Sequence, residues 1–410
     1  MVGVLDVPSV PQSKRIYDCV EHSLSVPRDI LAITGIRSEY DILYPALDAI
    51  QAHEELSAGV VASGGHVADT HGDTISYIQQ NGFEVVDSVA YLLRGDDKRM
   101  RAKGVGTLVA SLTEVVSRES PDILLVAGDR EEPLATAIVG NYLDIPVAHI
   151  FGGDPVWGNA DDPVRHAVSK MTHIHLTACA DHRDRLVQMG EHEFRTFDVG
   201  NPGLDRIRTV PELSREELSR EIGFDITEGP FLVLIKHPLS SERTAAGSQM
   251  ETTMKALADL SIPTVAIHPN TDPGSEEIID VLHEYQNYDF VSVHENFERD
   301  LFVNLLRYAT ALVGNSSAGI LEAPFLSLPA VNIGNRQTGR TNAGNVVYVD
   351  HDVDEIVEAV QRLTDDTRRA DLLEQTDTTY YGDGNSGPRI ADVLANIDLD
   401  TELLVKSNRY

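Results

Sequence analysis

The sequence predicts an α/β protein made of two doubly wound domains in tandem, and three observations support this prediction. Short apolar runs alternate with amphipathic stretches from residue 29 onward. The runs are rich in Val, Ile and Leu on both faces, as the strands of a buried parallel sheet require. The length of 410 residues exceeds the usual size of one hydrophobic core, which favours two domains.

The first domain, residues 29–205, is predicted to form a parallel sheet with crossover helices. Helical patterns at Tyr44–His53, Ala102–Arg118 and Leu134–Leu143 fall between the apolar runs. This alternation is typical of repeated βα units. The predicted strands are Ile30–Thr34, Ala58–Ala62, Glu84–Val89, Asp122–Ala127, Val147–Phe151, Ile174–Ala178 and Arg195–Val199.

A second series of apolar runs follows a seam near Gly200–Ile207 and defines a second domain at 206–385. Residues 1–28 are interpreted as an N-terminal extension, and 386–410 as a C-terminal helix and tail that pack back toward the first domain. Open α/β sheets bind ligands at the carboxyl ends of their strands, so a cleft between the domains is the expected site. The strands predicted here are Phe231–Ile235, Pro263–Ile267, Phe290–Val293, Ala311–Val313, Ala330–Ile333 and Val346–Val349.

The charge balance is strongly acidic. There are 65 acidic and 33 basic residues, which give a net charge of -32 spread along the chain. Such a surface repels nucleic acid and anionic membranes, so neither is expected as a partner. It suits a salt-rich cytoplasm, where screening removes the self-repulsion, and a halophilic source is our hypothesis. Equal folding at low and at molar KCl would contradict that hypothesis.

Cysteine use and hydropathy bear on where the protein resides. Cys19 and Cys179 are the only cysteines, so no disulfide framework or metal cluster is expected. No apolar run reaches the roughly 18 residues of a membrane helix. Residues 1–28 lack the apolar segment of a signal peptide. A reducing cytoplasm is therefore the expected location.

The most informative segment of the chain reads VGNSSAGILEAP. An apolar strand runs into a turn there, Gly314 and Gly319 permit close approach of a ligand, and a helix is predicted to begin near Ser316. The hydroxyls of Ser316 and Ser317 join unpaired helix-start amides to form an anion site. Glu322 lies about one turn further on, where it can accept hydrogen bonds from two hydroxyls. This pattern fits a diphosphate with a ribose, so a nucleotide sugar is the expected ligand; an ordinary capped helix is the alternative.

The other end of the chain favours the same ligand. Arg37 follows the first predicted strand in the loop GIRSEY. A guanidinium at the carboxyl end of a parallel strand suits a phosphate. A surface arginine without a ligand is the alternative.

Polar residues cluster at further strand ends of the first domain. Asp129 and Arg130 close one strand, Asp154 closes the next, and Asp161 stands at a helix start that also carries His166. Acids at neighbouring strand ends can act as acid and base when like charges and burial separate their pKa values. Helix capping by Asp161 and a structural pair of Asp129 with Arg130 are the alternatives. No Cys or His spacing indicates zinc, and no compact carboxylate motif demands magnesium.

The second domain adds polar residues at its own strand ends. His237 ends one strand in IKHP and suits phosphate binding, ribose binding or proton transfer, although a lone structural histidine is the alternative. Asn270 follows the next strand. Arg336, Gln337 and Arg340 lie on the Gly-rich loop GNRQTGR, where two guanidiniums can clamp an oxyanion.

Nine segments together resemble the UDP-N-acetylglucosamine 2-epimerase family, over residues from about 30 to about 394. The GDR and YGDGN forms are similar to those of its hydrolysing members, in sialic- and legionaminic-acid-type sugar pathways. The resemblance implies a GT-B-like fold with two Rossmann-like domains facing across a cleft, no cofactor or metal, and a homodimer or homotetramer. The segments read, in order, GIRSEY, GDREE, HIFGGD, DDPVRHAVSKMTHIH, GNPGLD, KHP, GNSSAGILEAP, NIGNRQTGR and YGDGN.

The resemblance also implies a reaction. UDP would be eliminated through a 2-acetamidoglucal, and water would then add to give UDP and free N-acetylmannosamine or a 4-acetamido analogue. A non-hydrolysing epimerase that gives UDP-N-acetylmannosamine is the first alternative. A GT-B glycosyltransferase and a nucleotide-sugar-binding protein without turnover are the others.

Site residues follow from the same resemblance, position by position. Phe151 stands where some members carry an acid, and HIFGGD ends in Asp154 rather than Glu, so the base that removes the C2 proton stays open. Ser316 and Ser317 would take phosphate, and Glu322 the ribose. The implied catalytic residues are Asp129, Asp154, Asp161 and His237; the implied UDP-sugar contacts are Arg37, Arg130, His166, Asn270, Ser316, Ser317, Gly319, Glu322, Arg336 and Gln337.

Overall fold

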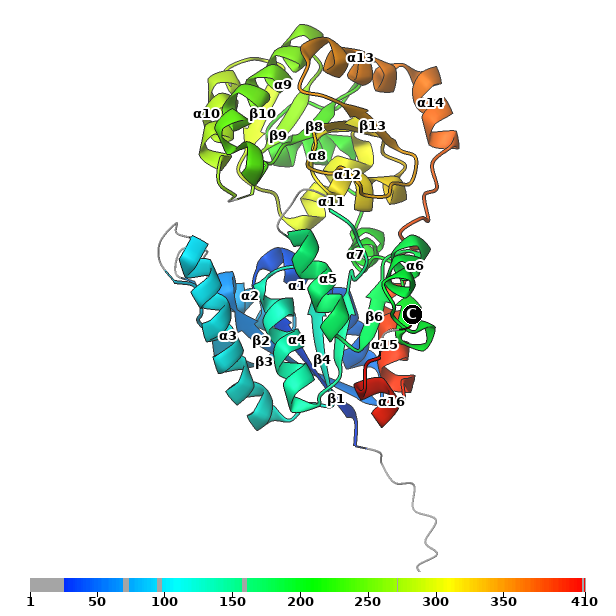
Figure 1. Cartoon of the computed structure of the whole chain (residues 1–410). Coiled ribbons are helices and arrows are strands. Elements are labelled where there is room, and N and C mark those ends of the chain that lie inside the picture. Colours follow the sequence, from blue (N-terminus) through cyan, green and yellow to red (C-terminus); the bar gives the residue numbers. More distant parts are fainter. Residues whose placement is uncertain are drawn as a thin grey trace, which may run out of the picture.

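The structure is a computed structural model that describes residues 26–68, 74–93, 98–156, 161–270, 272–407 and 409. Two parallel sheets, each flanked by helices, form an upper and a lower body in Figure 1. The predicted α/β class with two Rossmann-like domains is confirmed. Most of the predicted extension at 1–28 lies outside the described residues, which begin at residue 26.

The seven-stranded sheet of the N-terminal domain is parallel throughout, with the order β3-β2-β1-β4-β5-β6-β7. The chain moves outward from β1 to β3 and then returns to the other side of β1 with β4. This reversal opens a crevice at the carboxyl ends of β1 and β4. The strands are β1 (Arg28–Thr34), β2 (Leu56–Ser63), β3 (Glu84–Val89), β4 (Ile123–Ala127), β5 (Val147–Ile150), β6 (Ile174–Thr177) and β7 (Thr196–Asp198).

The six-stranded sheet of the C-terminal domain repeats this design, with the order β10-β9-β8-β11-β12-β13. Its reversal falls between β8 and β11. The turn after β8, with the sequence KHP, therefore lies beside the turn after β11, with the sequence NSS. The strands are β8 (Leu232–Ile235), β9 (Thr264–Ile267), β10 (Val291–His294), β11 (Ala311–Gly314), β12 (Ala330–Ile333) and β13 (Val346–Val349).

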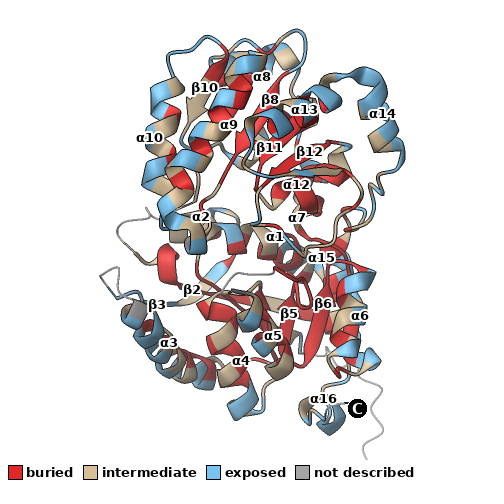
Figure 2. Cartoon of the chain, turned by 45° about the horizontal axis from the view of Figure 1, so that its top comes forward, coloured by how far each residue is buried: buried red, intermediate tan, exposed pale blue. Residues whose placement is uncertain are grey.

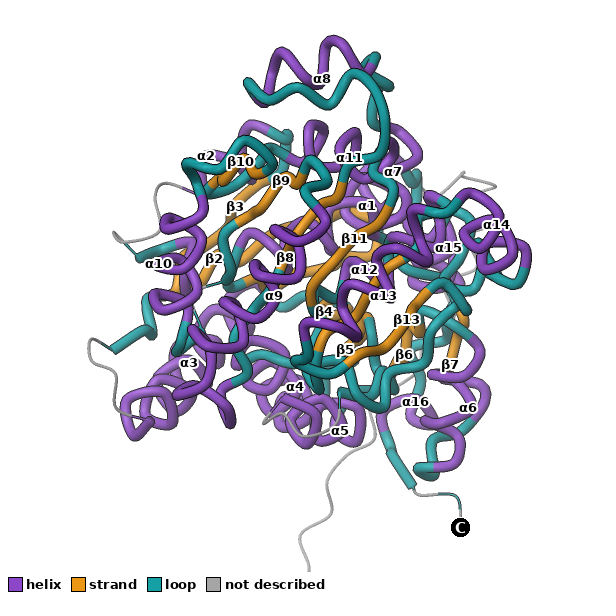
Figure 3. The backbone as a smooth tube through the Cα atoms, turned by 90° about the horizontal axis from the view of Figure 1, so that it is seen from above, coloured by secondary structure: helices purple, strands orange, loops and turns teal. Residues whose placement is uncertain are grey.

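Helices cover both faces of each sheet, so the central strands are buried. Every residue of β4 and of β8 is buried, and in Figure 2 the central strands are red while the outward helix faces are blue. Figure 3 shows the orange strands running between purple helices. None of the described helices has the length and apolar character needed to cross a membrane. The helices of the N-terminal half are α1 (Arg37–Ala52), α2 (Thr74–Gln80), α3 (Lys98–Glu119), α4 (Glu131–Leu143), α5 (Asp161–Met171), α6 (Ala180–Gln188) and α7 (Gly203–Thr209), with 3-10 turns at Gly64–His66 and Glu193–Arg195.

The C-terminal half returns to the N-terminal domain at its end. Helix α15 (Ser386–Asn396) packs on α1, and its first N–H groups donate to both carboxylate oxygens of Asp205, at 2.9 and 2.7 Å. Further on, the Lys406 ammonium reaches the buried Glu191 carboxylate at 2.8 Å. The other helices are α8 (Arg215–Ile222), α9 (Ala246–Leu260), α10 (Ser275–Tyr285), α11 (Arg299–Tyr308), α12 (Ala318–Leu321), α13 (Val353–Thr364), α14 (Asp366–Glu374) and α16 (Thr401–Leu404), with 3-10 turns at Ser240–Ala245 and Ala323–Leu326.

Two local expectations need correction. The loop predicted to hold Arg37 is already helical, because α1 begins at that residue. The helix predicted after Ser316 has only four residues, so Glu322 lies at its end rather than inside it. Pro324 gives the reason, because it has no N–H to donate to the Ile320 carbonyl four residues earlier, and a separate 3-10 turn runs from Ala323 to Leu326.

Candidate active site

Contacts between the domains bring the two crevices together. Arg340, on the loop between β12 and β13, pairs with Asp154, which follows β5. Arg37 Nη2 lies 2.8 Å from Glu298 Oε2, and Glu298 directly precedes α11. These two contacts place Asp154 and Arg37, at strand ends of the N-terminal domain, against the C-terminal domain.

Two of the predicted acids share one arginine. Asp129 follows β4 and pairs with Arg165 of α5, whose side chain is 6% exposed. Arg165 Nη1 also lies 3.1 Å from Asp154 Oδ2. His149 supports the turn, because its Nε2 is 2.7 Å from the Gly128 carbonyl oxygen and burial lowers the pKa of His149 to about 3. A single buried guanidinium thus links Asp129 to Asp154.

Asp154 is almost fully buried, with 1% of its side chain exposed. Burial alone would raise its pKa, but Arg340 and Arg165 outweigh burial and hold the pKa of Asp154 well below its usual range. His182 Nε2 lies 3.5 Å from Asp154 Oδ1, and burial lowers the pKa of His182 to about 4. Asp154 therefore stays ionised, but its affinity for a proton is lower than that of an unpaired carboxylate.

The start of α5 carries the third predicted acid. Asp161 is the first residue of the helix, and its side chain lies outside the described part of the chain. Asp162 Oδ1 accepts the N–H of Val156 at 2.8 Å and lies 3.6 Å from His166 Nε2. Burial lowers the pKa of His166, and Asp162 opposes that shift. Asp162 thus ties the segment after β5 to the helix.

A second group of acids surrounds the turn after β1. Glu39 Oε2 accepts the N–H of Gly35 at 2.8 Å, and Tyr91 donates to Glu132 Oε1 at 2.6 Å. A Cβ on Gly35 would lie 1.7 Å from Glu132 Oε1, so any larger residue there would displace this carboxylate. Burial and then Glu132 raise the pKa of Glu39 well above its ordinary 4.5, and burial also raises the pKa of Glu132. We call these two residues the Glu39–Glu132 pair.

The pair also affects the pKa of Arg130. Burial would lower its pKa, but Glu39 and Glu132 raise the pKa of Arg130 above its ordinary value. Within the described chain, its Nε is buried without a hydrogen-bond partner. A charged guanidinium with an unused donor binds oxyanions well, so Arg130 stays a candidate for contact with the UDP-sugar.

In the C-terminal domain, Asn315 organises the turn after β11. Gly314 has a φ of +129°, and a Cβ there would lie 2.0 Å from the Ile235 carbonyl oxygen, so glycine is required where β11 meets β8. Asn315 Oδ1 accepts the N–H of His237 at 2.7 Å, and its Nδ2 donates to the His237 carbonyl at 2.9 Å. These two bonds join the turns after β8 and β11.

Ser316 and Ser317 follow Asn315, and both are partly exposed. Ser317 is the N-cap of α12 without capping through its side chain, whereas Ser316 Oγ accepts the N–H of Ala318 at 3.3 Å. Gly319 faces β12, because a Cβ there would lie 3.2 Å from the Cβ of Ala330. Since α12 is so short, the predicted anion site depends on hydroxyls and backbone N–H groups more than on a helix dipole.

His237 presents a neutral imidazole. The N–H of Asn270 donates to His237 Nδ1 at 3.0 Å, so Nδ1 is the acceptor and the ring proton sits on Nε2. Burial and then Arg336 lower the pKa of His237 to about 3. An Nε2–H on a neutral ring suits hydrogen bonding to a phosphate oxygen better than transfer of a proton from an imidazolium.

The loop between β12 and β13 closes over the same turn. Arg336 Nη1 and Gln337 Nε2 both donate to the Asn315 carbonyl, at 3.1 and 2.9 Å. Gln337 is 2% exposed, and its Oε1 accepts from Arg340 Nη1 at 2.9 Å. Gln337 is therefore a link between Asn315 and Arg340.

Consecutive residues at the start of α11 hold two of the predicted UDP contacts. Glu298 pairs with Arg37, as described above, and Arg299 Nη2 lies 3.0 Å from Glu322 Oε2, although that oxygen has no hydrogen bond of good geometry. Arg299 Nη2 also donates to the Gly203 carbonyl at 3.3 Å. Each predicted contact thus has a partner of opposite charge at the N-terminal end of α11.

The sequence did not single out four residues that the structure adds to the site. Arg165 stands in the same segment as Asp161, and Asn315 in the same turn as the two serines, so their neighbours were a usable signal. Nothing in the sequence marks Glu298 or Arg299, because Glu298 meets Arg37 only across 261 residues of chain.

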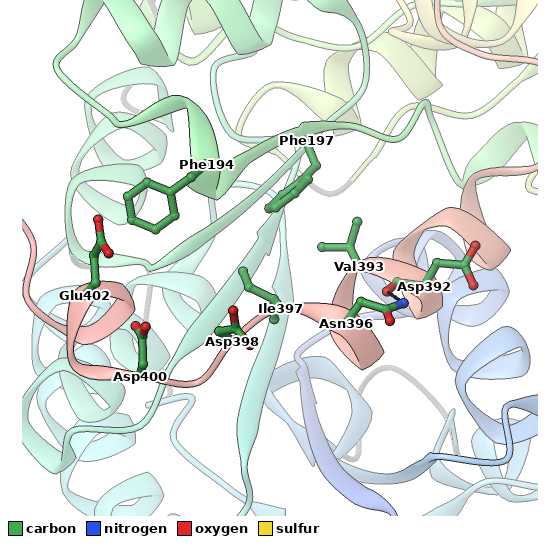
Figure 4. A pocket seen from close by; sticks show the side chains of 9 residues that line it. All are labelled: Phe194, Phe197, Asp392, Val393, Asn396, Ile397, Asp398, Asp400 and Glu402. Atoms are coloured by element: carbon green, nitrogen blue, oxygen red, sulfur yellow. Dashed lines mark hydrogen bonds between the residues drawn. The ribbon is translucent and has the colours of Figure 1, made fainter.

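A separate hollow of about 580 Å³ lies at the outer strand of the N-terminal sheet, between β7 and the C-terminal helices (Figure 4). Phe194 and Phe197 line one side. Four of the nine lining residues are acidic, so this hollow repels a diphosphate. Within the described residues, no group of His, Cys, Asp and Glu is suited to hold a metal ion.

Comparison with known proteins gives a family and a fold. The profile of the family described as UDP-N-acetylglucosamine 2-epimerase matches residues 48–395. The chain is 32% identical over 386 residues to the UDP-N,N'-diacetylbacillosamine 2-epimerase (hydrolyzing) of Legionella pneumophila, covering 93% of this chain and 100% of that protein. It is 31% identical over 368 residues to the UDP-N-acetylglucosamine 2-epimerase of Neisseria meningitidis, covering 90% and 95%.

Solved structures agree with the fold. The crystal structure of UDP-GlcNAc 2-epimerase from Neisseria meningitidis bound to UDP-GlcNAc superposes with a TM-score of 0.76. It is 18% identical in that alignment, which covers 89% of this chain and 99% of that one. The expected GT-B-like arrangement of the two domains is therefore confirmed.

Proposed function

Because the chain belongs to the UDP-N-acetylglucosamine 2-epimerase family, we propose that it is a hydrolysing 2-epimerase of a UDP-linked 2-acetamido sugar. A proton leaves C2 while the bond from C1 to the diphosphate breaks, and the electron pair forms the C1–C2 double bond of a 2-acetamidoglucal. Water then adds its hydroxyl at C1 and a proton at C2 on the opposite face. The products are UDP and a free sugar of mannosamine configuration.

The observation that supports this proposal most is the pairing of Arg165 with Asp129 and Asp154 beside the inter-domain site. It supplies two carboxylates at neighbouring strand ends, one of which is accessible. The Asp129 side chain is 21% exposed, against 1% for Asp154, so we assign proton transfer at the sugar to Asp129. Asp161 remains a candidate for the second acid.

The C-terminal half supplies the leaving-group site. Ser316, Ser317 and the Nε2–H of His237 would meet the diphosphate, and Glu322 the ribose. Arg37, Arg130 and Arg336 would offset the charge that develops on UDP as the bond to C1 breaks, which is a large electrostatic contribution to such reactions. His166, Asn270 and Gln337 would complete the contacts, and Gly319 would shape the turn. No step in this scheme requires a cofactor.

The name of the Legionella relative supports UDP-N,N'-diacetylbacillosamine as the first substrate to test, with UDP-N-acetylglucosamine second. A 4-acetamido product would enter a legionaminic-type pathway, and N-acetylmannosamine a sialic-acid-type one. We also propose a homodimer or homotetramer that needs high salt, which light scattering across KCl concentrations would test.

The decisive experiment is an NMR time course with each UDP-sugar, in molar KCl without added metal. Free UDP together with a sugar of inverted C2 configuration is the expected result. An intact UDP-sugar with inverted C2 would instead favour the non-hydrolysing epimerase. UDP binding without product from either substrate would favour a binding protein. Release of UDP that depends on an added acceptor would favour a glycosyltransferase.

A further inference from the structure

Arg340 makes a buried contact that crosses from one domain to the other. Its Nε lies 3.0 Å from Asp154 Oδ1, and its Nη2 contacts Asp154 Oδ2. Only 7% of the Arg340 side chain and 1% of the Asp154 side chain is exposed. Two parallel N–H···O contacts fix both the distance and the orientation of the partners, which a single ammonium contact does not.

On the C-terminal side, Arg340 is joined to the turn that is proposed to hold the diphosphate. Its third nitrogen, Nη1, donates to Gln337 Oε1 at 2.9 Å, and Gln337 Nε2 donates to the Asn315 carbonyl at 2.9 Å. The residue after Asn315 is Ser316. The loop is further anchored because the Tyr381 hydroxyl donates to the Thr341 carbonyl at 2.6 Å.

On the N-terminal side, Arg340 is joined to Asp129. Asp154 Oδ2 receives both Arg340 and Arg165, and the second Nη of Arg165 pairs with Asp129. The three side chains Arg340, Asp154 and Arg165 are all buried. If Arg340 moved away, Asp154 would keep one of its two arginine partners, Arg165, and the relative strength of the contacts that Arg165 makes with Asp154 and Asp129 would change.

We propose that Arg340 is a positioning residue that couples the nucleotide turn to Asp129, through the buried series Arg340, Asp154, Arg165. Asp129 is held in its reactive position only while the loop of Arg340 is docked on Asp154. The diphosphate at Ser316 and Ser317 stabilises that docked loop through Asn315 and Gln337. Elimination therefore starts only when the nucleotide is in place. This inference rests on the proposed function for its catalytic part, but not for its coupling part.

A variant pair separates positioning from simple stabilisation. In Arg340→Lys the charge is kept but the two-pronged contact is lost. The matched control is Arg389→Lys, because Arg389 also contacts both oxygens of one carboxylate, that of Asp383, at 2.8 Å each, but at the surface. Full-length proteins are compared by kcat, by the Kd for UDP and by Tm, in molar KCl.

For Arg340→Lys we expect kcat to fall about 100-fold, as for a reacting group displaced by about 1 Å, with the Kd for UDP within about threefold of wild type. Arg389→Lys should leave both values unchanged. In the double variant with Asp154→Asn, kcat should be no lower than in the worse single variant, because both changes break one series of contacts. A kcat within about threefold of wild type for Arg340→Lys would overturn the proposal, as would losses that simply add in the double variant.

A second readout does not depend on turnover. UDP should slow hydrogen exchange in α5 of the wild-type chain, and this protection should be absent in Arg340→Gln although UDP still binds. Unchanged exchange in wild-type α5 on saturation with UDP would overturn the coupling. If α5 is protected in this Arg340-dependent way but neither UDP-sugar is converted, the coupling stands and the proposed epimerase activity fails.

Discussion

Asp154 and the Glu39–Glu132 pair lie at the same edge of the N-terminal sheet and are similarly buried, but their pKa values move in opposite directions. Two arginines flank Asp154 and hold its pKa low. Glu39 and Glu132 have a tyrosine hydroxyl and a backbone N–H as their direct partners, and each repels the other's charge. Burial is common to both groups, so the cations that the fold supplies decide which carboxylates stay ionised.

The difference suggests a division of work. In the proposed mechanism the group with arginines provides the carboxylate for proton transfer, which is Asp129 on its exposed side. The Glu39–Glu132 pair interacts with the always-charged Arg130, which lowers the pKa of both glutamates without offsetting burial, and this guanidinium is the one we propose for an anionic ligand. The four predictions below test this contrast.

Asp129→Asn should have the largest effect. The amide cannot accept the C2 proton, so we expect kcat to fall by about 10²–10⁴-fold, the usual contribution of a general base. UDP affinity should stay within about threefold, because no contact of Asp129 with the nucleotide turn is expected. Asp144→Asn, at the exposed end of α4, is a matched control. Wild-type turnover in Asp129→Asn would remove Asp129 from the mechanism.

Asp154→Asn and Glu132→Gln make the same chemical change at the two groups and should differ in stability. Asp154→Asn leaves Arg340 and Arg165 without their shared carboxylate, a loss that typically costs about 3–5 kcal/mol when the pair is buried. Glu132→Gln removes a repelling charge and should change the free energy of unfolding by about 1 kcal/mol or less. Urea denaturation in molar KCl measures both. Equal losses of unfolding free energy in the two variants would show that burial, rather than neighbouring arginines, determines how much a carboxylate at this edge of the sheet contributes to stability.

The pH dependence of stability carries the same contrast. The raised pKa of Glu39 means that its favourable contribution is complete below the ordinary value of 4.5 and is lost as pH rises through the folded value. The depressed pKa of Asp154 means that its contribution is present above 3.8 and is lost as pH falls below that value. As pH rises above 4.5, Glu39→Gln should therefore lose less stability than wild type. A parallel decline in both proteins would contradict the raised pKa.

The sequence predicted the sheets well because both faces of each central strand are apolar, a pattern that few other structures produce. The bounds of β3, β12 and β13 were predicted to the residue. The short α12 was not foreseen, since Pro324 lacks the N–H that a continuing helix needs, and this outweighs the helical pattern. Arg165 and Arg340 gained their importance from contacts across the fold, and no local pattern encodes which carboxylate each arginine meets.

Glu298→Gln should have the smallest effect, and it tests whether an exposed ion pair resembles the buried ones. The Glu298 side chain is 77% exposed and that of Arg37 is 31% exposed, so their pair contributes little to stability. If Arg37 binds the diphosphate, it must give up Glu298, and the neutral amide should tighten UDP binding by less than about fivefold. Titration calorimetry at low and at molar KCl measures this change, which screening should reduce at high salt. Weaker binding in Glu298→Gln would mean that Glu298 aims Arg37 at the ligand, and the contrast between buried and exposed pairs would then extend to positioning as well as to charge.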